Sequence, residues 1–271
     1  MVKIEGALLK KLQMTELEMM IEVDRICHKH NICYSLDGGT LLGAIRHNGF
    51  IPWDDDADIV MLRDEYEKFY QVCKKELDTE RFFLQDYRTD KNYLWGYSKM
   101  RRNHTVFLRE GQEHVNCHTG VCIDIFVYDN VPDGWLVRRL HLFLCYLIRK
   151  GLYARVGKKN ADSVVMRKWF CIISKIPRNF WFKQIGWLAG ITNRKESCLV
   201  RHMTYPYRKQ CRYGLPRKCF DEYMDKDFEG HNFRIFKDYD LYLSRLYGNY
   251  MELPPPEKRK IHPASRVELP I

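Results

Sequence analysis

Residues 38–61 read GGTLLGAIRHNGFIPWDDDADIVM, and this stretch decides the fold that we expect. Residues 32–36, just before it, are short, apolar and compatible with a β-strand, which the glycines then break. Residues 41–46 return to a helical pattern, and residues 56–62 read as a second strand entered through a run of carboxylates. The order strand, glycine turn, helix, loop and strand predicts an α/β or α+β core.

The acid pair at the start of the second strand predicts half of a metal site. Asp56 and Asp58 project from the same face because side chains alternate along a strand. Neighbouring carboxylates at the start of an apolar strand are unfavourable unless a cation or a basic group compensates their charge. Such hard oxygen ligands suit Mg²⁺ or Mn²⁺, which complete their shells with water and substrate phosphates. The alternative is that DDDAD is a solvated acidic loop.

A third acid lies in the sequence VCIDIFV, residues 121–127. Asp124 shares one face of this predicted strand with Cys122 and Phe126. By itself it is also compatible with a solvent-facing strand side or a buried ion pair. Together with Asp56 and Asp58 it predicts a catalytic metal triad, in which Asp124 orients or deprotonates an acceptor hydroxyl.

The glycine turn is the expected phosphate-binding element. Gly38, Gly39 and Thr40 precede a helix, and glycines let backbone N–H groups approach a phosphate closely while the helix N-terminus favours an anion. Most glycine pairs are simply turns, so the combination with the acids carries the prediction.

Positive side chains near the acids are candidates to stabilise charge on a transferring phosphoryl group. They are Lys99 and Arg101 in YSKMRRNHT and Arg46 after the glycine turn, and His47 is a candidate phosphate contact. Each of them reads equally well as an ordinary surface residue.

Two aromatic residues near the glycine turn are candidates for a ligand contact. Tyr34 and Trp53 suit stacking on a base or holding a choline ammonium by cation–π attraction. The alternative for both is packing.

Periodicity predicts the remaining elements. Helices are expected at 15–30, with a capping box from Thr15 to Glu18, and then at 64–77, 135–153, 164–188 and 238–247. Further strands are expected at 81–87, 93–100, 105–108 and 120–128. We therefore expect a catalytic core at 1–131, a basic and aromatic helical lobe at 132–219, and a C-terminal segment at 220–271 that packs back on the core.

Charge and cysteine content limit the classes of partner and compartment. A formal charge of +10 attracts polyanions such as nucleotides, nucleic acids, anionic lipids and teichoic-type polymers. Between residues 135 and 195 fourteen Lys or Arg residues face one acid, Asp162, and tryptophans and phenylalanines are interleaved with them, which suits a membrane interface or a lipid-linked acceptor. The alternative is a helical lobe whose aromatics form its own core. The sequence shows no secretory signal and no window apolar enough to span a membrane, so we expect a cytoplasmic protein whose ten cysteines are reduced thiols. If the lobe binds lipid, we expect the protein to lie peripherally on the inner face of the cell membrane.

The segment from Tyr34 to Phe69 strongly resembles the LicD family of phosphocholine transferases and their fukutin-type relatives. The resemblance continues in the segments YSKMRRNHT, GVCIDIFVYD, FEG and YDLYLSRLYGNYMELPPPEKR, at 97–105, 120–129, 228–230 and 239–259. It implies a nucleotidyltransferase-like mixed sheet flanked by helices, a metal held by Asp56, Asp58 and Asp124, and transfer of phosphocholine or a similar phospho-alcohol from CDP-choline or a related CDP-alcohol. The implied acceptor is a hydroxyl of a cell-surface glycan of a lipopolysaccharide, capsule or teichoic-acid precursor. Ala57, Arg102 and Val127 depart from the family pattern, so choline is less secure than the reaction type.

Three other functions remain open at this point. A cytidylyltransferase that makes a CDP-linked compound would use the same acids. A nucleic-acid enzyme fits the charge, although no helix-turn-helix, zinc-finger or RNA-recognition signature is present. A non-catalytic glycan- or partner-binding protein would keep the fold and lack metal binding.

Overall fold

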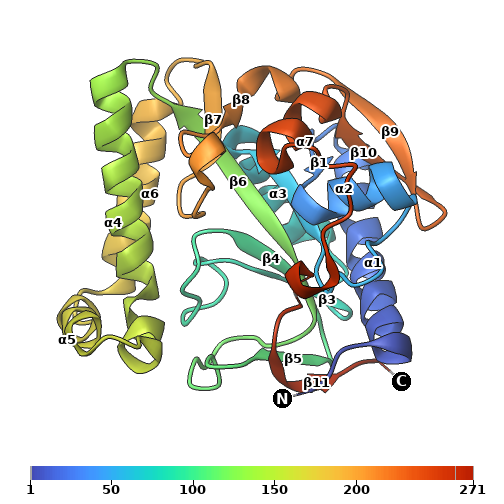
Figure 1. Ribbon diagram of the computed structural model, residues 1–271, viewed down its shortest axis with the longest axis horizontal. Coiled ribbons are helices and arrows are strands. Elements are labelled where there is room, and N and C mark those ends of the chain that lie inside the picture. The colour runs from blue at the N-terminus through green and yellow to red at the C-terminus, as the bar shows by residue number, and fades with distance from the viewer. Residues whose placement is uncertain (1, 260, 271) are drawn as a thin grey trace.

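The computed structural model describes residues 2–259 and 261–270, and it has a mixed sheet flanked by helices with a helical lobe at one side (Figure 1). The sheet strands are β1 (Ser35–Leu36), β2 (Asp58–Leu62), β3 (Phe82–Gln85), β4 (Ser98–Arg102), β6 (Cys122–Val131), β7 (Leu199–His202) and β8 (Leu215–Pro216). They follow the order β1-β2-β6-β4-β3, and β7 joins the far part of β6 and carries β8. Only the β2–β6 pair is parallel among these pairings. The expected α+β fold with a mixed sheet is confirmed.

Helices cover the sheet and extend to one side of it. They are α1 (Gly6–Lys29), α2 (Gly38–His47), α3 (Arg63–Glu76), α4 (Trp135–Asn160), α5 (Val164–Ile173), α6 (Arg178–Thr192) and α7 (Tyr239–Tyr247). Short 3₁₀ turns lie at Lys209–Cys211, Arg217–Phe220 and Pro256–Lys258. α1 and α3 pack on each other and on β6, so the central strand is buried. Within the described residues no helix is both long and apolar enough to cross a bilayer.

The first helix corrects one sequence prediction. α1 begins at Gly6, and Thr15 lies in its interior, where its hydroxyl donates to the Lys11 carbonyl at 2.9 Å. The predicted capping box was therefore wrong. Leu9 and Leu12 extend the buried stripe toward the N-terminus, so packing lengthens the helix beyond the local cap signal.

The predicted helix over 164–188 is two helices. α5 ends at Ile173 and α6 begins after Pro177. A proline has no N–H to donate and disfavours helical backbone in the residue before it, so Pro177 breaks the run.

The helical lobe, α4 to α6, has its own small core and is joined to the sheet by polar contacts. The core consists of Cys145, Ile148, Leu152, Phe182, Ile185, Leu188, Ala189 and Met203. Asn193, just after α6, accepts from the Asn130 amide at 2.8 Å and donates to Asp129 at 2.7 Å. Residues 199–216, within the stretch expected to be helical, contribute β7 and β8 to the sheet.

The C-terminal residues form a hairpin, a helix and an edge strand that the sequence pattern did not fully predict. The hairpin consists of β9 (Tyr223–Phe228) and β10 (His231–Phe236), and β11 (Ala264–Glu268) pairs with β5 (Val106–Arg109). Phe228, Phe233 and Tyr242 are part of the main hydrophobic core. The segment between α7 and β11 passes the residues that lead into β2, where the Nδ1 atom of His262 lies 3.1 Å from Asp55.

Candidate active site

Two of the predicted acids lie side by side on the two strands of the parallel pair. Asp58 on β2 lies in register with Asp124 on β6. The entry to β2 is held by backbone hydrogen bonds from Asp124 to Ala57 and from Asp37 to Asp58, both 2.9 Å long. Thr40 of the glycine turn is buried, and its hydroxyl accepts from the Asp58 amide at 2.8 Å. Thr40 therefore positions an acid of the site.

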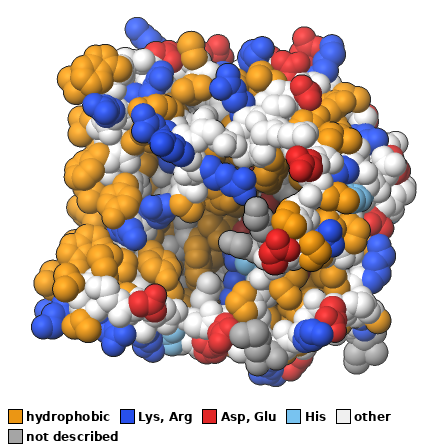
Figure 2. All heavy atoms as spheres, in the orientation of Figure 1, with side chains coloured by type: hydrophobic (Ala, Val, Ile, Leu, Met, Phe, Trp, Pro, Cys, Tyr) orange, Lys and Arg blue, Asp and Glu red, His pale blue; other side chains and the backbone are white. Residues whose placement is uncertain are grey.

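Asp56, Asp58 and Asp124 line one cavity of about 500 Å³. Its other walls hold three positive side chains, Arg109 of β5 and Arg149 and Lys150 of α4, together with aromatic residues. In the space-filling view this hollow lies between the lobe and the core, with basic side chains along its rim (Figure 2). The structure thus brings the predicted acids together and places phosphate-binding side chain types opposite them.

Burial and mutual repulsion disfavour the charged forms of several acids at the site. Loss of contact with bulk water, followed by the charges of Asp56 and Asp124, raises the pKa of Asp58 well above its usual value. Burial, then Asp56, raises the pKa of Asp54 to about 8. Behind them, burial raises the pKa of Glu16 on α1, and its Oε2 atom has no hydrogen-bond partner among the described residues. A hard divalent cation fits such a cluster of oxygen ligands.

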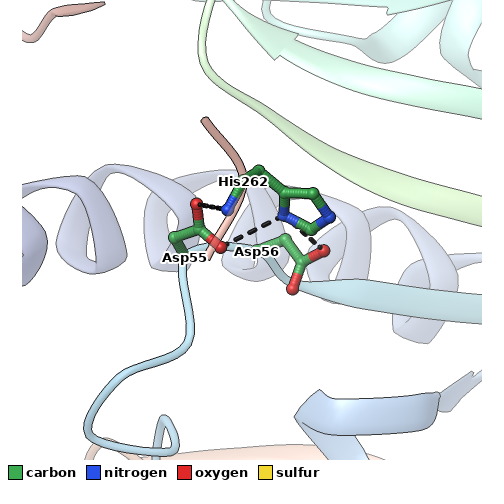
Figure 3. A group of neighbouring side chains, drawn as sticks. All are labelled: Asp55, Asp56 and His262. Carbon is green, nitrogen blue, oxygen red and sulfur yellow. Dashed lines mark hydrogen bonds and ion pairs between the residues drawn. The ribbon is translucent and has the colours of Figure 1, made fainter. Parts of the chain in front are cut away.

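The most compact group of potential ligands includes a histidine that the sequence prediction missed. Figure 3 shows His262 between Asp55 and Asp56: its backbone amide donates to Asp55 at 2.7 Å, and its Nδ1 atom lies 3.1 Å from Asp55 and 3.4 Å from Asp56. In the described part of the chain these three residues are the group whose ligand atoms all lie within 4.8 Å of one another, and Asp58 and Asp124 lie outside it. Asp55 is buried and ties the C-terminal segment to the site.

Lys99 lies beside Asp124 and does not line the main cavity. It is in register with Asp124 on the neighbouring strand, its ammonium donates to the Asp124 carboxylate, and its Nζ atom lies 5.1 Å from the centre of the Tyr97 ring. Burial opposes its charge, but Asp124 together with Cys122 and Tyr97 outweighs burial, and the pKa of Lys99 is raised. Lys99 therefore neutralises one acid of the predicted triad.

The other predicted cations make structural contacts. Arg101 is buried and donates to Gln85 at 2.7 Å and to the Gly120 carbonyl at 2.5 Å. Arg46 donates to His47 at 3.0 Å and to the Tyr250 carbonyl at 2.9 Å, at the far end of α2. Arg46, His47 and Arg101 are absent from the lining of the main cavity, and their role in substrate binding stays a prediction.

The glycine turn is pressed against the acids. Gly38 has φ of +51°, and a Cβ atom there would lie 3.3 Å from the Asp58 carboxylate, whereas a Cβ atom on Gly39 would lie 2.6 Å from that of Asp54. The Gly38 amide already donates to Asp37 at 2.7 Å, and Tyr242 donates to the same oxygen at 2.6 Å. A phosphate at the Gly38 amide would compete with Asp37. Close packing against the acids gives both glycines a structural reason, and phosphate binding by this turn stays a prediction.

The sequence prediction missed four residues that line the cavity, namely Arg109, Arg149, Lys150 and His262. Arg109 follows the strand predicted at 105–108 and is the last residue of β5, and nothing in the local pattern separates it from other surface arginines. His262 follows the PPPEKR motif by three positions, so the motif was the available signal. The α4 cations belong to the basic run, where periodicity alone did not show which residues turn toward the core.

Comparison with known proteins relates this chain to a family of phosphorus-group transferases. A family model described as LicD/FKTN/FKRP, nucleotidyltransferase domain, matches residues 31–137. Over 261 residues the chain is 29% identical to the lipopolysaccharide cholinephosphotransferase LicD of Haemophilus influenzae, and the match covers 94% of this chain and 95% of that protein. Residues 31–137 therefore carry the domain that the LicD family model describes. An uncharacterized protein of Rickettsia typhi is 35% identical over 119 residues, which cover 44% of this chain and 30% of that protein.

The LicD family model covers only part of the cavity. Its range contains Asp56, Asp58, Asp124 and Arg109, whereas Arg149, Lys150 and His262 lie beyond residue 137. The cavity is therefore built jointly by the matched domain, the helical lobe and the C-terminal segment.

Proposed function

We propose that this chain transfers phosphocholine from CDP-choline to a hydroxyl of a cell-surface glycan, with a divalent cation held by Asp56, Asp58 and Asp124. The observation that carries the proposal is the single cavity that combines these acids with Arg109, Arg149 and Lys150. Similarity along nearly the whole chain to a protein named as a lipopolysaccharide cholinephosphotransferase supports phosphocholine as the group and a glycan as the acceptor.

The chemistry of the proposed metal ligands supports a hard cation, Mg²⁺ or Mn²⁺, over a soft one. The three triad residues offer only carboxylate oxygens. Burial raises the pKa of Asp56 and of Asp58, and at Asp58 the charges of Asp56 and Asp124 raise it further. A bound cation would supply positive charge to the oxygens of the transferring phosphoryl group. His262 contacts Asp55 and Asp56, and we propose that it holds this loop in position.

The basic wall supports recognition of the two phosphates of a nucleotide diphosphate donor. Burial opposes the charge of Arg109, but Asp124 and the other acidic groups around it together outweigh burial, so the pKa of Arg109 is raised and the side chain stays charged. Arg149 and Lys150 lie on α4, across the cavity from the sheet that carries the acids. Arginine favours such sites because its planar group donates to two phosphate oxygens at once.

A smaller recess supports recognition of the choline ammonium. It has a volume of about 260 Å³, shares Asp58 with the main cavity, and is lined by Asp37 and by aromatic rings that include Tyr205, Tyr207 and Tyr247. Aromatic faces and carboxylates attract a quaternary ammonium ion. Arg208 lies 5.6 Å from the Tyr247 ring and already occupies one face of the recess.

The aromatic residues expected for this role lie elsewhere. Tyr34 is buried and donates to Asp24, and the Arg259 guanidinium lies 4.0 Å from the centre of the Trp53 ring. Both are absent from the two recesses at the acids, so the choline contact is assigned to the tyrosines next to Asp58.

The proposed reaction is a displacement at phosphorus. The acceptor oxygen forms a bond to the phosphorus of phosphocholine, the bond from that phosphorus to the oxygen of CMP breaks, and CMP leaves with the electron pair. Lys99 occupies one oxygen of Asp124, which leaves the other oxygen for the cation or for the acceptor proton. The reaction is an in-line transfer in which the protein mainly positions and stabilises charge.

The direct test uses CDP-choline labelled in the choline, Mg²⁺ and choline-free lipopolysaccharide or teichoic-acid precursor as acceptor. The proposal predicts CMP release and label on the glycan, both dependent on Asp58. Turnover with CTP and phosphocholine, and release of pyrophosphate, would instead establish a cytidylyltransferase, which the description of the matched domain as a nucleotidyltransferase domain also favours. A cytoplasmic location remains a prediction.

A further inference from the structure

The helical lobe presents apolar side chains to solvent in regular stripes. On α4, Leu136, Leu140 and Phe143 are 64%, 57% and 56% exposed, and their spacing places them on one helix face. Cys145 and Ile148 on the same helix point instead into the core of the lobe. The outer face of α4 therefore carries apolar surface that no part of the described chain covers.

The two other lobe helices repeat this pattern. On α5, Val164, Val165 and Ile172 are 63%, 76% and 68% exposed, and Phe170 is the buried residue of that helix. On α6, Phe180 and Trp187 are exposed and lie two turns apart. Figure 2 shows apolar side chains gathered along the outer edge of the molecule over α4 and α5, with basic side chains between them.

The charge of the lobe selects among possible occupants of this surface. Between residues 135 and 195 fourteen Lys or Arg residues accompany one acid, Asp162. A second copy of the chain would bring the same excess positive charge, so self-association through this face is electrostatically opposed. An anionic lipid surface offers both apolar depth and negative charge, and aromatic residues beside cations favour its interface. Arg139, whose guanidinium carbon lies 5.7 Å from the centre of the Trp135 ring, gives one such pair.

We propose that the outer faces of α4, α5 and α6 bind the surface of a membrane that contains anionic lipids. The inference goes beyond the proposed reaction and does not depend on it. It has one consequence for that reaction: α4 also contributes Arg149, Lys150 and Tyr153 to the wall of the main cavity. The helix on the membrane surface would thus border the cavity, where an acceptor glycan on a lipid carrier arrives.

The test is flotation of the full chain with vesicles of phosphatidylcholine alone or mixed with phosphatidylglycerol. The wild type is expected to float with the mixed vesicles and much less with phosphatidylcholine. Phe143→Ser combined with Val165→Ser and Ile172→Ser should lower the partition coefficient by at least about tenfold, because three apolar side chains are withdrawn from the interface. The matched control is Ile21→Ser with Met224→Ser, exposed apolar residues of α1 and β9, which should bind as the wild type does.

Three outcomes would overturn the proposal. The first is that the wild type does not bind mixed vesicles, and the second is that the control variant loses as much binding as the lobe variant. The third is that the wild type binds no vesicles and forms a dimer in sedimentation equilibrium, whereas the triple lobe variant is a monomer. Thermal melts of both variants show that loss of binding is not loss of fold. Asp58→Asn is expected to keep vesicle binding, so failure of the proposed reaction and failure of the membrane surface are separate results.

Discussion

Asp58 and Asp124 are direct register partners on the parallel strands β2 and β6, and a single cavity contains both of their side chains. Parallel neighbours point in the same direction at the same level, so the two charges are held together by the sheet itself. Burial and the neighbouring acids make the charged form of Asp58 unfavourable, so its pKa is raised. Stability and function therefore make opposite demands on this residue.

Asp58→Asn should separate these two demands. Without divalent cation, the variant should melt at a higher temperature than the wild type, because a neutral side chain removes repulsion from Asp56 and Asp124. Transfer activity should fall by at least about a hundredfold, since the cation loses a ligand. Differential scanning fluorimetry with and without Mn²⁺ checks both: Mn²⁺ should raise the melting temperature of the wild type only. An equal Mn²⁺ shift in the variant would place the cation elsewhere.

Arg109→Gln should weaken donor binding. We expect the KM for CDP-choline to rise about tenfold or more, because a charged donor to phosphate is replaced by a neutral one. Steady-state kinetics with varied CDP-choline measures this. Arg102→Gln is the matched control, because Arg102 pairs with Glu18 on the other side of the sheet and is absent from the cavity. A KM unchanged in Arg109→Gln would remove Arg109 from the donor site.

Tyr205→Leu should reduce the preference for choline. The quaternary ammonium loses an aromatic face worth about 1 kcal/mol or more, so kcat/KM for CDP-choline should fall about fivefold to tenfold. The loss for CDP-ethanolamine should be smaller, because a primary ammonium is more strongly hydrated. Competition between the two donors gives the ratio directly. Tyr87→Leu, an exposed tyrosine that stacks on Phe182, is the control. Equal losses for both donors would assign Tyr205 a packing role.

His118 should make the fold sensitive to acid. Burial, followed by Arg101, lowers the pKa of His118 to about 4, and the Gly120 amide donates to its Nδ1 atom at 3.1 Å, which requires that atom to be unprotonated. A folded-state pKa below the unfolded value of about 6.5 gives stability that is present above pH 6.5 and is lost as pH falls toward 4.

His118→Gln should therefore lose less stability than the wild type between pH 7 and pH 5. The difference is about 1 kcal/mol after allowance for partial exposure, or roughly 2–4 °C in melting temperature. Melts at the two pH values for both proteins measure it. An unchanged pH dependence in the variant would show that His118 does not titrate differently in the folded and unfolded chains.

The sequence predicted that the acids lie close together, because their pattern is local. Alternation along one strand puts Asp56 and Asp58 together, and the apolar run around Asp124 marks a central strand. The fold class followed from the same stretch. The basic side chains near the acids were harder to predict, because their positions depend on tertiary contacts. Lys99 meets Asp124 through strand register, and Arg109 lies on β5, which pairs with β11.

Short strands and the lobe were also beyond local patterns. The β9–β10 hairpin turns at Glu229 and Gly230, both with positive φ, and lacks the asparagine or aspartate that usually marks such a turn. The domain division at residues 131 and 219 remains a prediction. In the structure, β7 and β8 lie on the sheet although they follow the helices of the lobe in sequence.

The most direct test of the central claim is isothermal titration of CDP-choline into the full chain, with and without Mg²⁺, for the wild type, Asp56→Asn and Asp58→Asn. The account predicts Mg²⁺-dependent binding to the wild type that both variants lose while remaining folded in thermal melts. Binding of equal affinity without Mg²⁺, or binding retained in both variants, would contradict a donor site organised by a cation on these acids.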